Sequence, residues 1–238
     1  MSSHPEELKS ILEQIQKTFQ ISFEPLIVDG TSLSVLNIDN MPAHLDRLLA
    51  TGSIQQPLRD LPLWAKAWPA AMILGRFLRK FDLAGKSVLD LGCGMGILSL
   101  IAAQYNPAQI TAADIEPQAL DFAKANILTN LLQDRVSTRL LDIRSPNLPS
   151  GQKFDIIAAS EILYLDDLHR PLVKFMRRHL DSAGTAFFCT DISRLKPRFQ
   201  ELASKDFDIR ESKIGIKSSN GADKPERRIY NILILEHK

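Results

Sequence analysis

Three glycines at alternate positions follow an apolar run that carries one aspartate. The segment reads Val88-Leu89-Asp90-Leu91-Gly92-Cys93-Gly94-Met95-Gly96. Glycine allows tight backbone turns, and its lack of a side chain lets a ligand approach the peptide groups closely. A strand, a glycine-rich turn and a helix in this order therefore predict a ligand site. Ile97 stands where a dinucleotide-binding G-x-G-x-x-G motif has its last glycine, which disfavours a nicotinamide cofactor.

Acidic residues end the next two apolar runs of the chain. Asp114 is followed by Ile115, and Asp142 is followed by Ile143. Because ligands of open α/β sheets bind at the carboxyl ends of the strands, we expect both acids at one crevice. The carboxylate of Asp114 suits the two hydroxyls of a ribose, and that of Asp142 suits an exocyclic amine, with the two isoleucines enclosing a purine ring. A helix N-cap or a solvated loop position is the alternative for Asp142.

Strands that alternate with amphipathic helices must position these residues. We expect parallel strands over 87–91, 110–114, 136–142, 154–160 and 185–191. Helices are expected over 97–105, 117–130 and 168–180, the last one followed by a helix stop at 181–184. A terminal antiparallel pair is expected over 207–214 and 229–236, joined by a mobile polar connection over 215–228. This alternation is typical of a parallel sheet with helices on both faces. The expected class is α/β, with a Rossmann-like, doubly wound, seven-stranded sheet that ends in an antiparallel strand pair.

The first 60 residues predict a small α+β extension. Ser3 and Glu6 have the spacing of a helix capping box, and apolar residues recur at helical spacing up to Phe19. Two short strands over 21–28 and 33–38 flank the turn dipeptide Asp29-Gly30, and a short helix is expected over 43–49. We therefore divide the chain into an accessory helix and hairpin over 1–60 and a main domain over 61–238.

Composition excludes several classes of function. Of the 238 residues, 29 are Lys or Arg and 28 are Asp or Glu, so a net charge of +1 gives no basic footprint for nucleic acid or anionic lipid. No apolar run reaches the roughly 20 residues of a membrane span. Cys93 and Cys189 lie in apolar segments, and the charged N-terminus is unlike a signal peptide, which predicts a cytoplasmic location. The five histidines and two cysteines form no metal-binding pattern, so no metal is expected.

The segment DLGCGMG resembles the first motif of the class I, seven-strand methyltransferases that use S-adenosylmethionine (SAM), and Asp114 resembles their ribose-binding acid. The resemblance covers roughly residues 62–238. It implies a SAM-dependent methyltransferase whose second product is S-adenosylhomocysteine. The cofactor-binding residues that we expect on this basis are Trp68, Asp90, Gly92, Cys93, Gly94, Gly96, Asp114, Ile115, Asp142, Ile143 and Ser160.

Two further segments resemble the family 16 protein-lysine methyltransferases. The W-A-x-x-W-P form of residues 64–69 is similar to the tryptophan-led helix of that family, most closely in the branch that modifies the electron-transfer flavoprotein beta subunit. Helical spacing places Trp64 and Trp68 on one face; the resemblance gives Trp68 a cofactor contact, and Trp64 lies either there or in the core. Ser160-Glu161-Ile162-Leu163-Tyr164 resembles the D-x-x-Y motif, with Glu161 in place of the aspartate, which implies Glu161 and Tyr164 as catalytic residues.

Methyl transfer from a sulfonium mainly needs an aligned acceptor and exclusion of water. A lysine amine, with an ordinary pKa of about 10.4, must first lose a proton, and aromatic surroundings from Trp68 and Tyr164 favour its neutral form. Glu161 could orient the incoming ammonium or accept a hydrogen bond from the amino group of the cofactor. We expect a protein-lysine N-methyltransferase; a small-molecule methyltransferase and a non-catalytic SAM-binding or assembly protein are the alternatives. Residues 160–163 replace an N-P-P-Y signature, which argues against nucleobase acceptors.

Overall fold

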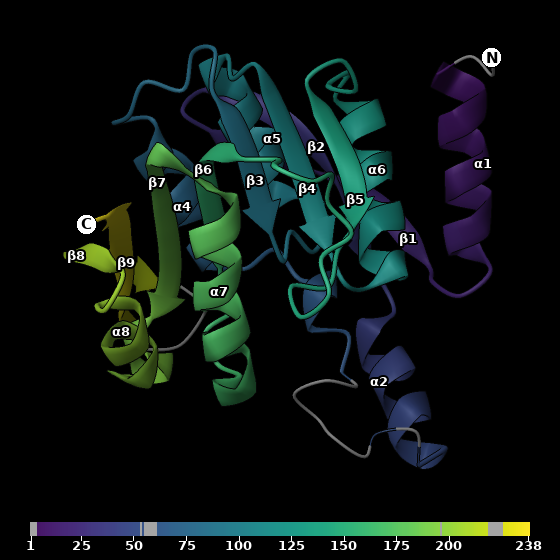
Figure 1. Ribbon diagram of the computed structural model, residues 1–238. Coiled ribbons are helices and arrows are strands. Elements are labelled where there is room, and N and C mark those ends of the chain that lie inside the picture. The colour runs from purple at the N-terminus through teal and green to yellow at the C-terminus, as the bar shows by residue number, and fades with distance from the viewer. Residues whose placement is uncertain (1–3, 53, 55–60, 196, 219–225) are drawn as a thin grey trace.

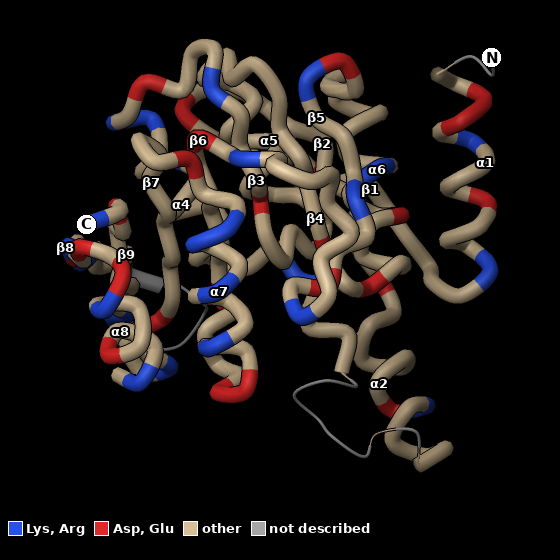
Figure 2. Tube along the Cα trace, in the orientation of Figure 1, with Lys and Arg blue, Asp and Glu red and all other residues tan. Residues whose placement is uncertain are grey.

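The computed structural model describes residues 4–52, 54, 61–195, 197–218 and 226–238 (Figure 1). The predicted capping residue Ser3 and residues 219–225 of the predicted polar connection lie outside this range. Acidic and basic residues are intermingled over the described elements, as Figure 2 shows. Within the described part, none of the helices combines the length and the apolar character needed to cross a bilayer.

A seven-stranded sheet forms the centre of the molecule (Figure 1). Its strands are β3 (Ser87–Leu91), β4 (Gln109–Asp114), β5 (Val136–Leu140), β6 (Phe154–Ser160), β7 (Leu180–Asp191), β8 (Phe207–Ser218) and β9 (Glu226–His237), in the spatial order β5-β4-β3-β6-β7-β9-β8. The strands from β5 to β7 pair in parallel, and β9 runs antiparallel to both β7 and β8. The predicted fold class is confirmed, including the terminal antiparallel strands.

Helices cover both faces of this sheet, and the alternation of side chains along the strands fills two separate cores. The helices are α4 (Pro69–Leu78), α5 (Ile97–Ala102), α6 (Pro117–Thr129), α7 (His169–His179) and α8 (Pro197–Ala203). Phe187 of β7 packs in the core that includes residues of α4, α5 and α6. Its neighbour Phe188 packs in the opposite core with α7 and α8. The carboxyl ends of β3 to β7 consequently meet at one edge of a fully covered sheet.

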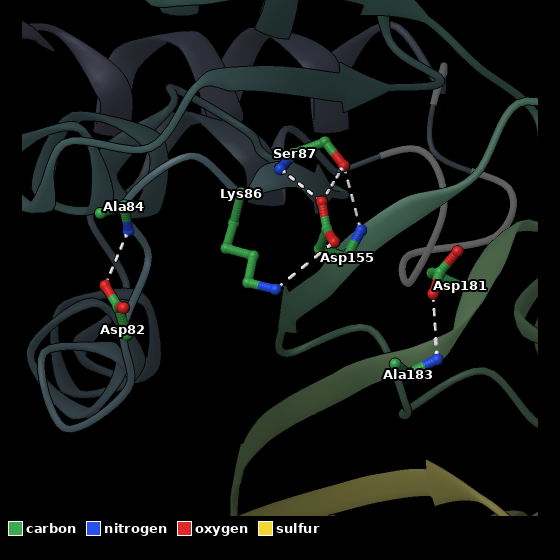
Figure 3. Close-up of polar contacts among 7 residues, drawn as sticks. All are labelled: Asp82, Ala84, Lys86, Ser87, Asp155, Asp181 and Ala183. Carbon is green, nitrogen blue, oxygen red and sulfur yellow. Dashed lines mark hydrogen bonds and ion pairs between the residues drawn. The ribbon is translucent and has the colours of Figure 1, made fainter.

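Polar contacts fix the register of β3 and β6 at the opposite, amino-terminal edge (Figure 3). The carboxylate of Asp155 accepts hydrogen bonds from the backbone N–H of Ser87 at 2.8 Å and from its hydroxyl at 2.7 Å. Lys86 lies 3.7 Å from the same carboxylate. These hydrogen bonds, with a smaller contribution from the charge of Lys86, lower the pKa of Asp155. These contacts therefore join the amino-terminal ends of β3 and β6.

The N-terminal extension packs against α6. It consists of α1 (His4–Gln16), the antiparallel pair β1 (Ile21–Val28) and β2 (Thr31–Ile38), and α2 (Met41–Ala50). A third core joins Phe19 and Leu36 of the extension to Phe122 of α6 and Met95 of the glycine-rich segment. Helix α2 extends from the body on the side where the parallel strands end (Figure 1). The division of the chain at residue 60 stays a prediction.

Two local expectations in the second half of the chain are wrong, and one helix was not expected. The residues predicted as a helix stop form the start of β7, where the register with β6 shifts between Phe154 and Ile156; Gly184 suits this irregularity because a Cβ there would lie 2.8 Å from the carbonyl oxygen of Asp155. Helix α8 was not expected. The polar connection is also shorter than predicted, since residues 215–218 extend β8 and residues 226–228 begin β9.

The tryptophan-led segment is not one helix. Residues Leu63–Ala65 form a 3₁₀ turn, Lys66 is extended, and Trp68 is the N-cap of α4 with φ −71° and ψ 135°. Pro69 explains the break, because the residue before a proline avoids the helical conformation. Trp64 and Trp68 therefore do not share a helical face.

Candidate active site

A pocket of about 530 Å³ opens at the edge where the parallel strands end. Its volume lies in the range of small-molecule sites. The sequence-predicted residues that line it are Trp68, Gly92, Cys93, Gly94, Asp114, Ile115, Asp142, Ile143, Ser160, Glu161 and Tyr164. Asp90 and Gly96, which were also predicted, are not among the lining residues. The sheet topology thus brings together side chains from the ends of β3, β4, β5 and β6.

Two glycine positions of the glycine turn (residues 92–96) are packed too closely for a side chain. Gly92 and Gly94 have φ values of 69° and 52°, in the left-handed region. A Cβ at Gly92 would lie 2.7 Å from Cγ2 of Ile162, and one at Gly94 would lie 3.0 Å from the carbonyl oxygen of Trp64. The turn is therefore held between the segment after β6 and the segment before α4, with its backbone along the pocket.

Asp114 is fixed by this turn. Its Oδ2 accepts a hydrogen bond of 2.8 Å from the backbone N–H of Gly94, and its Oδ1 accepts one of 3.0 Å from Glu116. The residue is 8% exposed, and burial raises the pKa of its carboxyl group. A carboxylate offers about four acceptor positions, so two hydrogen bonds leave room for the paired hydroxyls of a ribose.

Asp90 has a different environment. It is buried, and its Oδ2 accepts hydrogen bonds from the backbone N–H of Ser99 at 3.1 Å and from the Ser99 hydroxyl at 2.7 Å. Burial raises the pKa of Asp90 to about 7. This side chain joins β3 to α5 beneath the glycine turn.

Asp142 lies in a short turn after β5. Its Oδ1 accepts a hydrogen bond of 2.9 Å from the backbone N–H of Arg144, whose side chain reaches Asp167 at 2.9 Å. Ile115 is 49% exposed and lines the same side of the pocket as Asp142 and Ile143. Asp142 therefore combines the two alternatives: it makes the local hydrogen bond expected of a loop aspartate, and it lines the pocket as expected of a purine-binding residue.

Glu161 adopts a left-handed backbone conformation, with φ 54°. Its carboxylate accepts hydrogen bonds of 3.1 Å from the Thr190 hydroxyl and from the backbone N–H of Asp191, and lies 3.3 Å from the guanidinium of Arg194. Its side chain is only 7% exposed. Burial raises the pKa of Glu161, although Arg194 and the hydrogen bonds act in the opposite direction. The carboxylate therefore joins β6 to the end of β7.

The two tryptophans have separate surroundings. Trp64 packs against Phe122 and Phe19, with ring centroids 5.3 and 6.0 Å away, in the core of the N-terminal extension. Trp68 donates a hydrogen bond of 2.7 Å from Nε1 to the carbonyl oxygen of Leu63. Both tryptophans line the pocket.

Two cations lie against the Trp68 ring. Nζ of Lys66 is 4.9 Å from the ring centroid, and Cζ of Arg194 is 5.1 Å from it. The sequence predicts the segment from Asp191 to Arg194 at this edge, either as part of the acceptor site or in a structural role, but it assigns no role to Lys66. Lys66 stands inside the W-A-x-x-W-P segment, which was a usable signal, but the approach of Arg194 depends on where β7 ends in the sheet.

The fold and the pocket define a class I methyltransferase. The model of the family described as "Ribosomal protein L11 methyltransferase (PrmA)" matches residues 71–213, and the chain belongs to this family. The sequence-based identification of a methyltransferase is thereby confirmed. Within the described residues, no group of three or more His, Cys, Asp and Glu side chains could hold a metal ion.

Similar proteins include named protein methyltransferases. The chain is 34% identical over 139 residues to the protein N-lysine methyltransferase METTL21A of Danio rerio, a match covering 56% of this chain and 62% of that protein. It is 34% identical over 92 residues to the ribosomal protein L11 methyltransferase of Shewanella amazonensis, covering 39% of this chain and 30% of that one. The matches thus span less than two thirds of these relatives.

Solved structures share the fold. A ribosomal protein L11 methylase from Lactobacillus delbrueckii has a TM-score of 0.52 and 24% identity, covering 71% of this chain and 77% of that one. The TYW2 protein of P. horikoshii, solved in complex with MeSAdo, has a TM-score of 0.56 and 15% identity, covering 96% of this chain and 82% of that one. The electron-transfer flavoprotein branch stays a prediction.

Proposed function

We propose that this chain is a SAM-dependent methyltransferase that methylates a lysine side chain of a protein. The observation that carries the cofactor part of the proposal is the Asp114 carboxylate, which lies at the end of β4, is held by Gly94 of the glycine turn and lines the pocket. Relatives named for a protein N-lysine acceptor and for a ribosomal protein support the protein acceptor.

The residues present fit the cofactor. Gly92 and Gly94 line the pocket, and a side chain at Gly94 would collide with the Trp64 carbonyl and displace the turn. Asp114 would accept hydrogen bonds from the ribose hydroxyls, while Ile115 and Ile143 would enclose the adenine beside Asp142. The cofactor supplies a methyl group activated on a sulfonium.

The acceptor would enter beside Tyr164, Leu165 and Leu168, which line the pocket in the segment after β6. Apolar and aromatic walls exclude water and penalise a charged amine, so they lower the pKa of an entering lysine and favour its nucleophilic form. Tyr164 is the residue that we assign to orienting this amine.

The proposal includes a cytoplasmic location. Cys93 and Cys189 are both buried free cysteines. Unpaired buried thiols are typical of proteins in reducing compartments.

A labelling experiment tests the function. The purified protein is incubated with methyl-labelled SAM and a cell lysate, which is then separated into protein and small molecules. We expect label on protein, recovered as methyllysine after hydrolysis, and a strong loss of label with Tyr164→Phe. Label only among small molecules would favour a small-molecule acceptor, and no label would favour a non-catalytic protein.

Asp114→Ala provides the matching binding test. Calorimetry with S-adenosylhomocysteine should show at least a tenfold loss of affinity, because a buried charged acceptor of two hydroxyl hydrogen bonds is removed. Affinity equal to that of the unaltered protein would contradict the ribose assignment.

A further inference from the structure

The Glu161 carboxylate is directed at its own protein rather than at the pocket opening. Thr190, Asp191 and Arg194 contact it from the end of β7, and the side chain is nearly inaccessible to solvent. A carboxylate engaged in this way is poorly placed to receive an incoming ammonium. Its position is better suited to fixing the guanidinium of Arg194.

Arg194 is the exposed member of this group. Its side chain is 35% exposed, lines the pocket and stacks near Trp68. A guanidinium has five N–H donors in a planar fork that matches a carboxylate, more donors than the contact with Glu161 uses. The pair with Glu161 and the Trp68 ring together limit the orientations of the guanidinium.

The charged residues that line the pocket lie at different strand ends. Asp114, Glu116 and Asp142 lie at the ends of β4 and β5, where Arg144 pairs with Asp142 and Asp167. Lys66 and Arg194 lie against the Trp68 ring, and Arg194 pairs with Glu161. Neighbouring strands are about 4.8 Å apart, so the ends of β4 and β7 are roughly 14 Å apart. A ligand with its ribose at Asp114 that crosses the glycine turn would end near Arg194.

We propose that Arg194 binds the carboxylate at the amino-acid end of the cofactor, and that Glu161 is the positioning residue that holds Arg194 in place. The assignment rests on the proposed function. It also gives a reason for a glutamate in the D-x-x-Y-like motif: an aspartate is one methylene shorter and would fall short of the guanidinium from the same backbone position. In this proposal the contact to the cofactor carboxylate is made by Arg194, which follows β7, and Glu161 of the D-x-x-Y-like motif does not touch the cofactor carboxylate.

Calorimetry with two probes tests the assignment. S-adenosylhomocysteine carries the carboxylate, and its decarboxylated analogue does not. Arg194→Gln should weaken binding of S-adenosylhomocysteine about tenfold, the effect of one charge-assisted hydrogen bond. Binding of the decarboxylated analogue should stay unchanged, which also shows that the variant is folded.

Arg210→Gln is the matched control. Arg210 also pairs with a glutamate, Glu236 at 2.8 Å, but it is exposed on β8 and absent from the pocket lining. Its removal should change neither affinity. Glu161→Gln should weaken S-adenosylhomocysteine binding less than Arg194→Gln does, and should add no further loss when Arg194 is already Gln, because its effect acts through the guanidinium.

Two results would overturn the assignment. One is unchanged S-adenosylhomocysteine affinity in Arg194→Gln. If only the KM of a protein acceptor rises in this variant, Arg194 binds a carboxylate of that acceptor and not the carboxylate of the cofactor. The other is an equal loss for both probes. Failure of the proposed function is distinct: a wrong lysine acceptor shows in the labelling experiment and leaves binding of both probes by the unaltered protein intact, whereas an unaltered protein that binds neither probe has no cofactor site.

Discussion

The side chain of Asn126 joins two segments that are far apart in the chain: its Oδ1 accepts a hydrogen bond of 2.7 Å from the backbone N–H of Leu36, 90 residues earlier. Its Nδ2 donates a hydrogen bond of 2.9 Å to the carbonyl oxygen of Met95 in the glycine turn. Asn126 is fully buried. A single side chain of α6 therefore connects the N-terminal hairpin to the glycine turn.

Substitution of Asn126 should uncouple these segments. Asn126→Leu leaves the Leu36 N–H and the Met95 carbonyl without partners in the interior, and we expect a loss of about 2–4 kcal/mol in the free energy of unfolding. Denaturant unfolding measures the loss, and hydrogen exchange should show earlier exchange of hairpin amides. Asn130→Leu is the control, because Asn130 bonds Ser34 at a partly buried site. Equal losses in the two variants would contradict the special role of Asn126.

Two glycine-to-alanine substitutions separate the cost of a left-handed backbone conformation from the cost of a steric collision. Gly85 and Gly94 both have positive φ, but a Cβ at Gly85 meets nothing within 4 Å, whereas one at Gly94 meets the Trp64 carbonyl at 3.0 Å. Gly85→Ala should cost only the left-handed conformation, about 1 kcal/mol of stability. Gly94→Ala should cost more and also weaken S-adenosylhomocysteine binding. Unchanged binding in Gly94→Ala would mean that the turn does not contact the cofactor.

Asp90 makes stability depend on pH. Burial raises the pKa of Asp90 from its ordinary value of 3.8 to about 7 in the folded protein. The folded state then holds the proton more tightly than the unfolded state does. The contribution of this group is fully present below pH 3.8 and decreases as the pH rises toward 7, by about 1.4 kcal/mol per pH unit.

Asp90→Asn should remove this slope, because the amide oxygen can still accept the hydrogen bonds from Ser99 and does not ionise. Urea unfolding between pH 4 and pH 8 measures the free energy for both proteins. The two curves should converge toward low pH, and the variant should be the more stable protein near pH 7. Parallel curves would show that Asp90 titrates normally.

The sequence predicted the parts of the molecule that depend on local patterns. Continuous apolar runs located β3 and β6 at their observed limits, and the position of Asp114 at the end of a strand followed from the same pattern. The antiparallel end of the sheet was predictable because two strand-like runs lacked a helix between them.

Features that depend on distant contacts were not predictable. The start of β7 was hidden because Gly184, which accommodates an irregular pairing with β6, also looks like a helix stop. The break before α4 is of another kind: Pro69 is a local signal for it, and the helical spacing of the apolar residues was given more weight in the prediction. The pairing of Glu161 with Arg194 depends on β6 and β7 being neighbours in the sheet, which no local pattern specifies.

His169 and His179 stand at the two ends of α7 in similar surroundings. A ring nitrogen of His169 donates to the carbonyl oxygen of Leu163 at 2.9 Å, and one of His179 donates to that of Gln152 at 3.0 Å. Both residues are buried. The two histidines bond different segments: His169 bonds Leu163, which directly precedes Tyr164, whereas His179 bonds Gln152, which precedes β6 at the other edge of the sheet.

We therefore expect His169→Leu and His179→Leu to lose similar stability, about 1–3 kcal/mol each, because each leaves one buried carbonyl without a donor. Only His169→Leu should lower kcat, since the Tyr164 side chain would lose its support, and S-adenosylhomocysteine affinity should stay the same in both. His169→Gln, which keeps an N–H donor, should recover part of the activity. If kcat falls equally in the two leucine variants, the effect comes from general destabilisation and His169 does not position Tyr164.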